Sequence, residues 1–310
     1  MLVEARSDVV ATQEGTEVAT AVKGRSLWQD AGRRFIRNRA AVFFVGVLAA
    51  VVLFTIVGPF VAHYTIEKVD WALLGKVPAL GGPSFANGHF FGVDQTGRDL
   101  FIRVIQGTQI SLTVGVLGSA VAVVVGTLYG AIAGYFGGRL DSAMMRFVDI
   151  LYSIPYMFIL ILLLIIFGRS FALLFVGIGL ISWLGMARVV RGQTLTLKNR
   201  EFVEAAVATG VKPLAIVIRH IVPNLLGIVV VYATLLIPEM ILLESFISFL
   251  GLGIQEPNTS LGALISEGAQ TMQYGTFWQL GFPLGFFVVT LFAFFFVGDG
   301  LRDALDPKDR

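Results

Sequence analysis

Hydrophobic residues along the chain gather into six long runs that are separated by shorter polar segments. A helix needs roughly 20 such residues to cross the hydrocarbon core of a bilayer, because backbone polar groups cannot be left unpaired in lipid. Each run reaches or approaches this length. The pattern therefore predicts an all-α, polytopic membrane protein. Its six spanning helices are expected at residues 40–62, 104–136, 150–168, 170–187, 221–240 and 277–298.

The positions of Lys and Arg predict the direction in which these helices cross, since cytoplasmic segments carry an excess of both residues. If both termini are cytoplasmic, the inside segments hold 18 Lys and Arg residues and the outside segments hold 5. We therefore expect the N-terminus and the C-terminus inside. The chain then divides into a cytoplasmic tail, a first spanning helix, an outer loop, a five-helix core with a large inside loop at 188–223, and a second cytoplasmic tail. The five parts are 1–39, 40–62, 63–103, 104–300 and 301–310.

Composition excludes several classes of protein. The chain is 56% hydrophobic and 14% charged, its net charge is +2, and no stretch interleaves basic with aromatic residues, which argues against nucleic acid as a partner. It has no cysteine, and its three histidines are far apart, so neither a thiolate site nor a His cluster for zinc is predicted. No cofactor is expected.

Known nucleotide-binding and hydrolase motifs are also missing from the 310 residues. The phosphate-binding pattern G-x-x-x-x-G-K-[ST] does not occur, and neither do H-E-x-x-H or G-x-S-x-G. These absences argue against an intramembrane enzyme. An ion-coupled secondary transporter is disfavoured too, because neither inverted repeats nor buried ionisable residues are evident. A transporter of this sequence would need energy from a partner.

The large inside loop contains a short predicted helix, from Glu201 to Thr209, that ends at Gly210. Glu201 and Glu204 lie on its polar sides. A small, mildly apolar face is formed by Phe202, Ala205, Ala206 and Thr209. Periodicity alone leaves two interpretations open: a solvated connector, or an element that docks into a partner.

The first outer loop contains the motif FGVDQTGRD at 91–99. The carboxylates of Asp94 and Asp99 are suited to accept backbone hydrogen bonds. Two glycines, Gly92 and Gly97, can supply positive φ. We therefore favour a tight polar turn, which also holds Arg98. Direct contact with a substrate, ordering of an outer mouth and contact with a binding protein are the alternatives. Two carboxylates are too few for a typical calcium loop.

Several polar residues beside the spans have local interpretations. Asp141 is predicted to cap a helix on residues 142–144, and Arg146 is predicted to pair with Asp149. Pro155 should kink the third span. Two further carboxylates, Glu239 and Glu244, are placed at or beyond the outer end of the fifth span by its expected length. Their position makes a proton relay a minor alternative.

Motifs along the chain resemble those of one membrane-protein family. Glu204-Ala205-Ala206, followed by Gly210 and Pro223, is similar to the "EAA" loop of ABC importer permeases. The run RHIVPN at 219–224 resembles the "RHILPN" form of the peptide-transport branch, and the outer motif resembles its "FGTDxxGRD" signature. The segments 134–155 and 248–257 match further blocks. The ending GDGLRDALDP at 298–307 is similar to that of the C-type dipeptide and oligopeptide permease subunit.

This resemblance implies a type I ABC importer permease fold in a bacterial inner membrane, non-enzymatic in itself. The implied partners are a homologous B-type permease subunit, two ATPase subunits, an extracytoplasmic binding protein, membrane lipid and a peptide substrate. It also implies that the short inside helix is a coupling helix. The implied coupling residues are Glu201, Phe202, Glu204, Ala205, Ala206, Thr209, Gly210 and Pro223. Nickel, glutathione or an oligosaccharide remain alternative cargoes, and the residues that line the pathway are not assigned.

Overall fold

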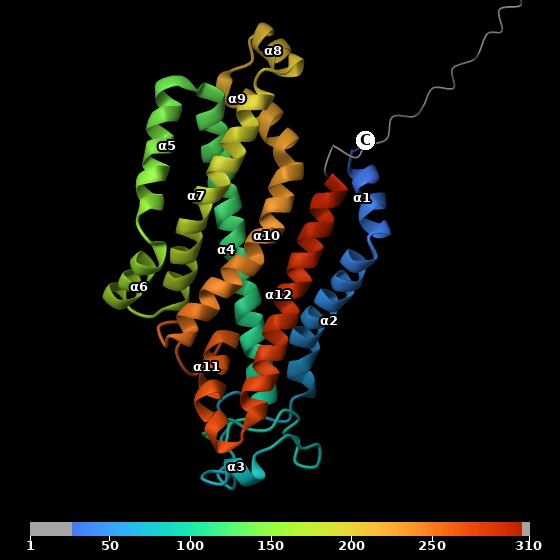
Figure 1. Cartoon of the computed structure of the whole chain (residues 1–310), viewed down its shortest axis with the longest axis vertical. Helices are drawn as coiled ribbons and strands as arrows, with labels where there is room; N and C mark the ends of the chain where they lie inside the picture. The colour runs from blue at the N-terminus through green and yellow to red at the C-terminus, as the bar shows by residue number, and fades with distance from the viewer. Residues whose placement is uncertain (1–26, 306–310) are drawn as a thin grey trace, which may run out of the picture.

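The structure, a computed structural model, describes residues 27–305 as helices joined by turns and loops, with three isolated β-bridges and no sheet in this range. Figure 1 shows the long helices running side by side. The helices are α1 Leu27–Arg37, α2 Arg39–Val61, α3 Val77–Leu80, α4 Leu100–Phe136, α5 Gly138–Ser153, α6 Tyr156–Phe167, α7 Phe171–Leu197, α8 Glu201–Ala208, α9 Pro213–Ile216, α10 Val222–Phe249, α11 Leu261–Thr271 and α12 Phe277–Leu305. A π-helical turn, Val217–Ile221, precedes α10, and a 3₁₀ turn, Met272–Tyr274, follows α11.

Five helices in the described part of the chain are long and apolar enough to cross a membrane, and a bent pair makes the number six. The pair is α5 and α6, which meet at an angle of 74°. Pro155 lies at this break, where it caps α6 and has no N–H to continue the preceding helix, so the predicted kink is confirmed. The prediction of an all-α fold with six spans is confirmed, with α5 and α6 together counted as one span.

Several helices extend past the hydrophobic runs from which they were predicted. The fourth span continues as α7 to Leu197, and the fifth continues as α10 to Phe249. Because the α-helical backbone satisfies its own hydrogen bonds, it can leave the hydrocarbon region without ending. The segment between the fifth and sixth spans is also partly helical, since it contains α11.

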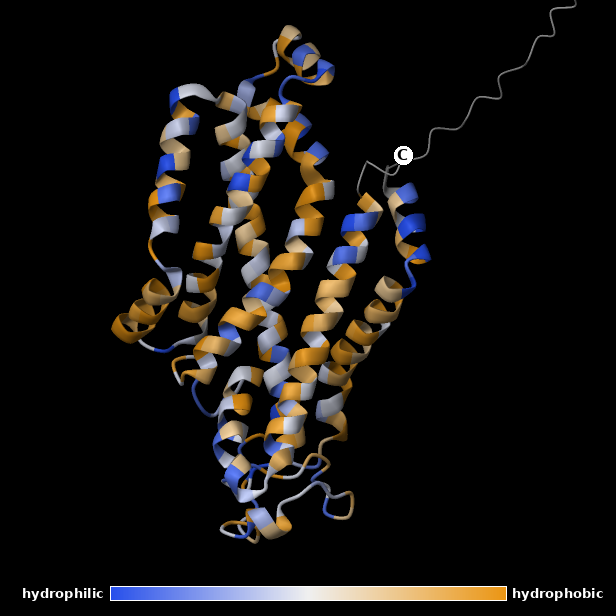
Figure 2. Cartoon of the chain, viewed as in Figure 1, coloured by the Kyte–Doolittle hydropathy of each residue, from blue (hydrophilic) through white to orange (hydrophobic). Residues whose placement is uncertain are grey.

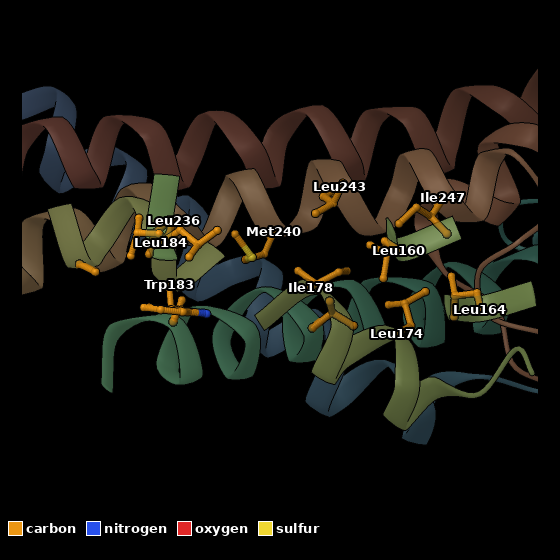
Figure 3. Packing of buried hydrophobic residues seen from close by; sticks show 14 residues of the cluster. Leu160, Leu164, Leu174, Ile178, Trp183, Leu184, Leu236, Met240, Leu243 and Ile247 are labelled. Carbon is orange, nitrogen blue, oxygen red and sulfur yellow. The ribbon is translucent and has the colours of Figure 1, made fainter. Parts of the chain in front are cut away.

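Close packing of α4 against α7 forms the centre of the bundle. Gly126, Gly130 and Gly134 of α4 face α7, and a Cβ added at Gly130 would overlap the carbonyl oxygen of Ala187. Small residues at this spacing let two helix backbones approach closely. Beside this contact, Figure 3 shows apolar side chains of α6, α7 and α10, including Leu160, meeting in one buried cluster.

The two ends of the bundle differ in what they carry. In Figure 1, α8, α1 and the end of α12 lie at the top, whereas α3 and α11 lie at the bottom. Figure 2 shows hydrophobic ribbon along most of α2, α6 and α12 between these ends. Large apolar side chains remain exposed there, such as Phe43 of α2 and Phe158 of α6. This surface suits lipid tails or the spans of another subunit.

Candidate functional site

Helix α8 is a separate short element whose two ends are defined by local chemistry. Its first turn carries Glu201 and Glu204, whose negative charge complements the positive end of the helix dipole. At its C-terminal end the N–H of Gly210 donates to the carbonyl of Val207 (3.0 Å), and the N–H of Val211 donates to that of Ala206 (3.1 Å). This hydrogen-bond pair requires a left-handed residue, which Gly210 supplies with φ of 77°.

One face of α8 fixes it to the rest of the protein. Val203 and Ala206, three residues apart, are buried and belong to a cluster with Ile216, Val217 and Ile221 of the segment leading into α10. This observation corrects part of the predicted face, because Ala206 points inward rather than outward. The remaining members of that face are exposed: Phe202, Ala205 and Thr209. The inward anchor that the sequence interpretation missed is Val203.

A shallow pocket of about 530 Å³ lies beside α8. It is lined by Tyr135 and Phe136 at the end of α4, by Lys198 after α7, and by Glu204 and Val207 of α8 itself, among others. Pro223 is not part of this pocket; it is exposed in the first turn of α10, after the π-helical turn. The structure therefore places seven of the eight predicted coupling residues on α8 or its C-terminal cap and the eighth, Pro223, on the next long helix.

At the opposite end, the outer motif forms the predicted polar turn. Asp94 Oδ1 accepts hydrogen bonds from the backbone N–H groups of Thr96 (2.8 Å) and Arg98 (3.0 Å). Gly92 and Gly97 have φ of 79° and 77°, as the turn requires. Gly92 also faces close neighbours, since an added Cβ would lie 2.6 Å from a backbone oxygen. The prediction of a tight turn with Asp94 as a backbone acceptor is confirmed.

The turn also contains an ion network that the sequence interpretation did not predict. Arg103, 1% exposed, bonds through Nη1 to the Asp94 carboxylate and to Glu267 Oε2 of α11 (2.7 Å). Arg98 contacts the second oxygen of Asp94 (2.7 Å) and Glu256 Oε1 (2.8 Å). The sequence does contain one signal of this network. Arg103 stands at the start of an apolar helix, where a buried charge requires a partner. The network joins α4, α11 and the outer turn.

Charge in this network shifts the pKa values of its carboxyl groups. Burial raises the pKa of Asp94, but the charges of Arg103 and Arg98 and the hydrogen bonds from Arg98 and Thr96 outweigh burial and hold the pKa below its ordinary value. A hydrogen bond from Arg98 likewise lowers the pKa of Glu256. Both groups are therefore carboxylates at neutral pH. Asp94, Arg98 and Glu267 line a pocket of about 190 Å³ at this end.

Asp99 has a different role from Asp94, because it starts α4. Its Oδ1 accepts from the N–H of Ile102 (3.0 Å), and its Oδ2 lies 2.8 Å from Nδ1 of the buried His89. Burial raises the pKa of Asp99, against the hydrogen bonds that favour its ionised form. Asp99 accepts a backbone hydrogen bond as predicted, and it does so as a helix cap.

Glu244 is the most buried carboxyl group of the spans, with no exposed surface. Its Oε1 accepts from Ser248 (2.7 Å), and its Oε2 accepts from Ser111 of α4 (2.9 Å). The N–H of Leu261, the first residue of α11, donates to the Ser111 hydroxyl (3.4 Å). We expected Glu244 at or beyond the end of the span. Because α10 continues to Phe249, the residue instead lies inside the bundle, where α4, α10 and α11 meet.

Two local predictions near the opposite end are wrong. Asp141 does not cap a helix: α5 begins at Gly138, and the Asp141 carboxylate accepts two hydrogen bonds from Arg191 of α7 (2.5 and 2.6 Å). Asp149 pairs with Arg188 of α7 (2.7 Å) rather than with Arg146. In both cases a cation on a neighbouring helix replaces the local partner. Within the described residues, no group of His, Asp and Glu side chains is arranged to hold a metal ion.

Comparison with known proteins gives a consistent assignment. Residues 126–310 match the family described as "Binding-protein-dependent transport system inner membrane component", and residues 26–78 match the "N-terminal TM domain of oligopeptide transport permease C". The oligopeptide transport system permease protein OppC of Escherichia coli K12 is 57% identical over 299 residues, covering 96% of this chain and 97% of the relative.

Other relatives extend the comparison. OppC of Haemophilus influenzae is 54% identical over 289 residues, covering 93% of this chain and 91% of the relative. The dipeptide transport system permease protein DppC of Bacillus subtilis is 40% identical over 303 residues, covering 97% and 92%. These matches extend over nearly the whole chain and agree with its helical, membrane-spanning fold. The chain therefore belongs to the family of inner-membrane permease components of binding-protein-dependent, ABC-type transport systems.

Proposed function

We propose that this chain is the C-type permease subunit of an importer for oligopeptides or dipeptides, and that it receives its driving force through α8. The proposal on cargo is supported by two relatives, 54% and 57% identical to this chain, that are permease proteins of oligopeptide transport systems. A relative named for glutathione transport, from Pectobacterium atrosepticum, is 36% identical. Peptides are accordingly the favoured cargo over glutathione, nickel or an oligosaccharide.

The single observation that carries the coupling role is the position of α8. The helix stands at one end of the bundle, is held by Val203 and Ala206, and leaves Phe202, Ala205 and Thr209 uncovered by the described residues. Small exposed residues allow close approach by the cleft of another protein. The chain has no phosphate-binding loop, so ATP hydrolysis belongs to separate ATPase subunits that hold α8.

The complete transporter then contains two ATPase subunits, a homologous B-type permease and an extracytoplasmic binding protein. The end that carries α8 and both described termini faces the cytoplasm, and the end that carries α3 and α11 faces the binding protein. ATP binding closes the ATPases, moves the coupling helices and opens the path between the two permeases to the outside. This subunit supplies half of that path and catalyses no reaction.

Coupling is tested by making the exposed face of α8 bulky. Ala205→Arg should abolish co-purification of the ATPase subunits and peptide-stimulated ATP hydrolysis, because the added side chain fills the space that the partner needs. Ser142→Arg, an exposed change at the same end but on α5, is the matched control and should retain both. Uptake of a labelled peptide that survives deletion of residues 200–212, or that needs no ATP, would overturn the proposal.

A further inference from the structure

Helix α10 carries an uncovered carboxyl group within its apolar length. Glu239 is exposed, and it makes no hydrogen bond or ion pair with another described residue. The helix continues for ten residues beyond it, to Phe249, which is about 15 Å at the α-helical rise. The following residues on the same face are apolar and exposed: Leu242 (43%) and Phe246 (52%). The helix therefore extends about three turns beyond Glu239.

Glu239 is the last member of a row of polar side chains that we name the polar stripe: Asp149, Tyr152, Arg188, Tyr232 and Glu239. Tyr232 lies two turns before Glu239 on α10. A Cβ added at Gly185 of α7 would lie 2.8 Å from the Tyr232 hydroxyl and 3.9 Å from that of Tyr152, so the two phenols converge there. The stripe joins α5, α7 and α10, and Figure 2 shows hydrophilic positions along each of these helices.

Charges within the polar stripe do not cancel. Arg188 lies 4.3 Å from the centroid of the Tyr152 ring and donates to Asp149 Oδ1 at 2.7 Å. That pair is neutral as a whole, which leaves Glu239 as the uncompensated charge. Charged side chains on spanning helices rarely face lipid tails; they face a water-filled cavity or a partner. The net negative charge of the stripe suits a cationic occupant.

We propose that the polar stripe lines the translocation pathway and that Glu239 binds the N-terminal ammonium group of a peptide in transit. This inference rests on the proposed peptide cargo. A carboxylate only accepts hydrogen bonds, and an ammonium group only donates them, so the two are matched in both charge and hydrogen bonding. The Tyr232 and Tyr152 hydroxyls offer further polar contacts toward the α8 end.

The test uses the whole transporter in proteoliposomes, supplied with a tripeptide or its desamino analogue at concentrations that saturate the binding protein. Wild-type and variant permeases receive cargo from the same binding protein. The preference of that protein for one cargo over the other therefore cancels when the initial uptake rate of the variant is divided by that of the wild type. We expect Glu239→Gln to slow tripeptide uptake roughly tenfold and desamino uptake by about twofold at most, since only the tripeptide loses a charge-assisted hydrogen bond. Glu239→Asp should restore part of the tripeptide rate.

Glu67→Gln removes the same charge from an exposed position of the outer loop and should leave both rates unchanged. Equal slowing of both cargoes by Glu239→Gln, or no slowing of either, would overturn the inference. Loss of the B-type permease from the purified Glu239→Gln complex would also overturn it, by showing that Glu239 holds the two permeases together rather than binding cargo. If the wild-type complex carries neither cargo, the proposed function fails and the inference fails with it.

Discussion

Arg103 is the buried cation of the ion network at the end of the bundle that carries α11. Its guanidinium is 1% exposed and bonds to Asp94 and to Glu267. Arg103→Met leaves both carboxylates without this cation, and removal of one partner from a buried pair typically destabilises a protein by roughly 3–5 kcal/mol. We expect about 3 kcal/mol, near the lower end of that range, because Arg98 still contacts Asp94. A lower thermal unfolding midpoint of the purified protein in detergent would confirm the loss.

A second substitution tests whether the destabilisation comes from loss of the ion pair or from loss of packing. Adding Asp94→Asn to Arg103→Met removes the buried charge that the first change leaves behind. The double variant should therefore be less destabilised than the sum of the two single variants, by more than about 0.5 kcal/mol. Additive losses would show that Arg103 and Asp94 do not act as a pair.

Residue roles were predictable from the sequence where the partner is local. Asp94 and Gly97 follow turn chemistry, which involves only neighbouring residues, and both were assigned correctly. The partner of Arg103 on α11 is 164 residues away, and no sequence spacing indicates such a contact. For the same reason Asp149 was assigned to Arg146 rather than to Arg188, which lies on another helix.

Among the secondary-structure elements, α11 is attached to α4 and α10 at its N-terminal end through Glu244 and Ser111. Glu244 accepts from Ser111 of α4, and Ser111 in turn accepts from the first N–H of α11. Glu244→Ala removes the shared acceptor, leaves buried hydroxyls unsatisfied and should destabilise this junction by roughly 1–3 kcal/mol. We expect faster amide hydrogen exchange across residues 261–271 in the variant, measured by mass spectrometry.

Glu244→Gln is the matched control, because an amide oxygen can still accept hydrogen bonds from the serines. It should exchange at a rate closer to that of the wild type. If Glu244→Ala leaves exchange in α11 unchanged while the chain remains folded, the carboxyl group does not hold this helix.

The existence of the long helices was predictable from hydrophobic length, but their ends and orientations were not. Backbone hydrogen bonding lets α10 continue to Phe249 after the apolar run weakens. The inward face of α8 depends on which residues meet the segment at 216–221, so periodicity alone could not distinguish Val203 from Phe202 as its anchor. Tertiary contacts determined both features.

For the whole molecule, the distribution of basic residues between the two ends of the bundle predicts one direction of insertion into the membrane. The excess of Lys and Arg on the α8 side predicts that this end is cytoplasmic and that the α11 end is outside. The sequence has no cysteine, so single-cysteine variants can report each end without a background signal. Gln273→Cys follows α11, Lys212→Cys follows α8, and both positions are exposed.

A membrane-impermeant maleimide should label Gln273→Cys in right-side-out spheroplasts, and it should label Lys212→Cys only in inside-out vesicles. The cysteine-free protein should stay unlabelled in both, and detergent should make both cysteines reactive. The reverse pattern would place α8 outside, where no ATPase could reach it, and would remove the basis for the proposed coupling. Labelling of both cysteines from one side would contradict a chain that crosses the membrane between them, because these positions lie at opposite ends of the bundle.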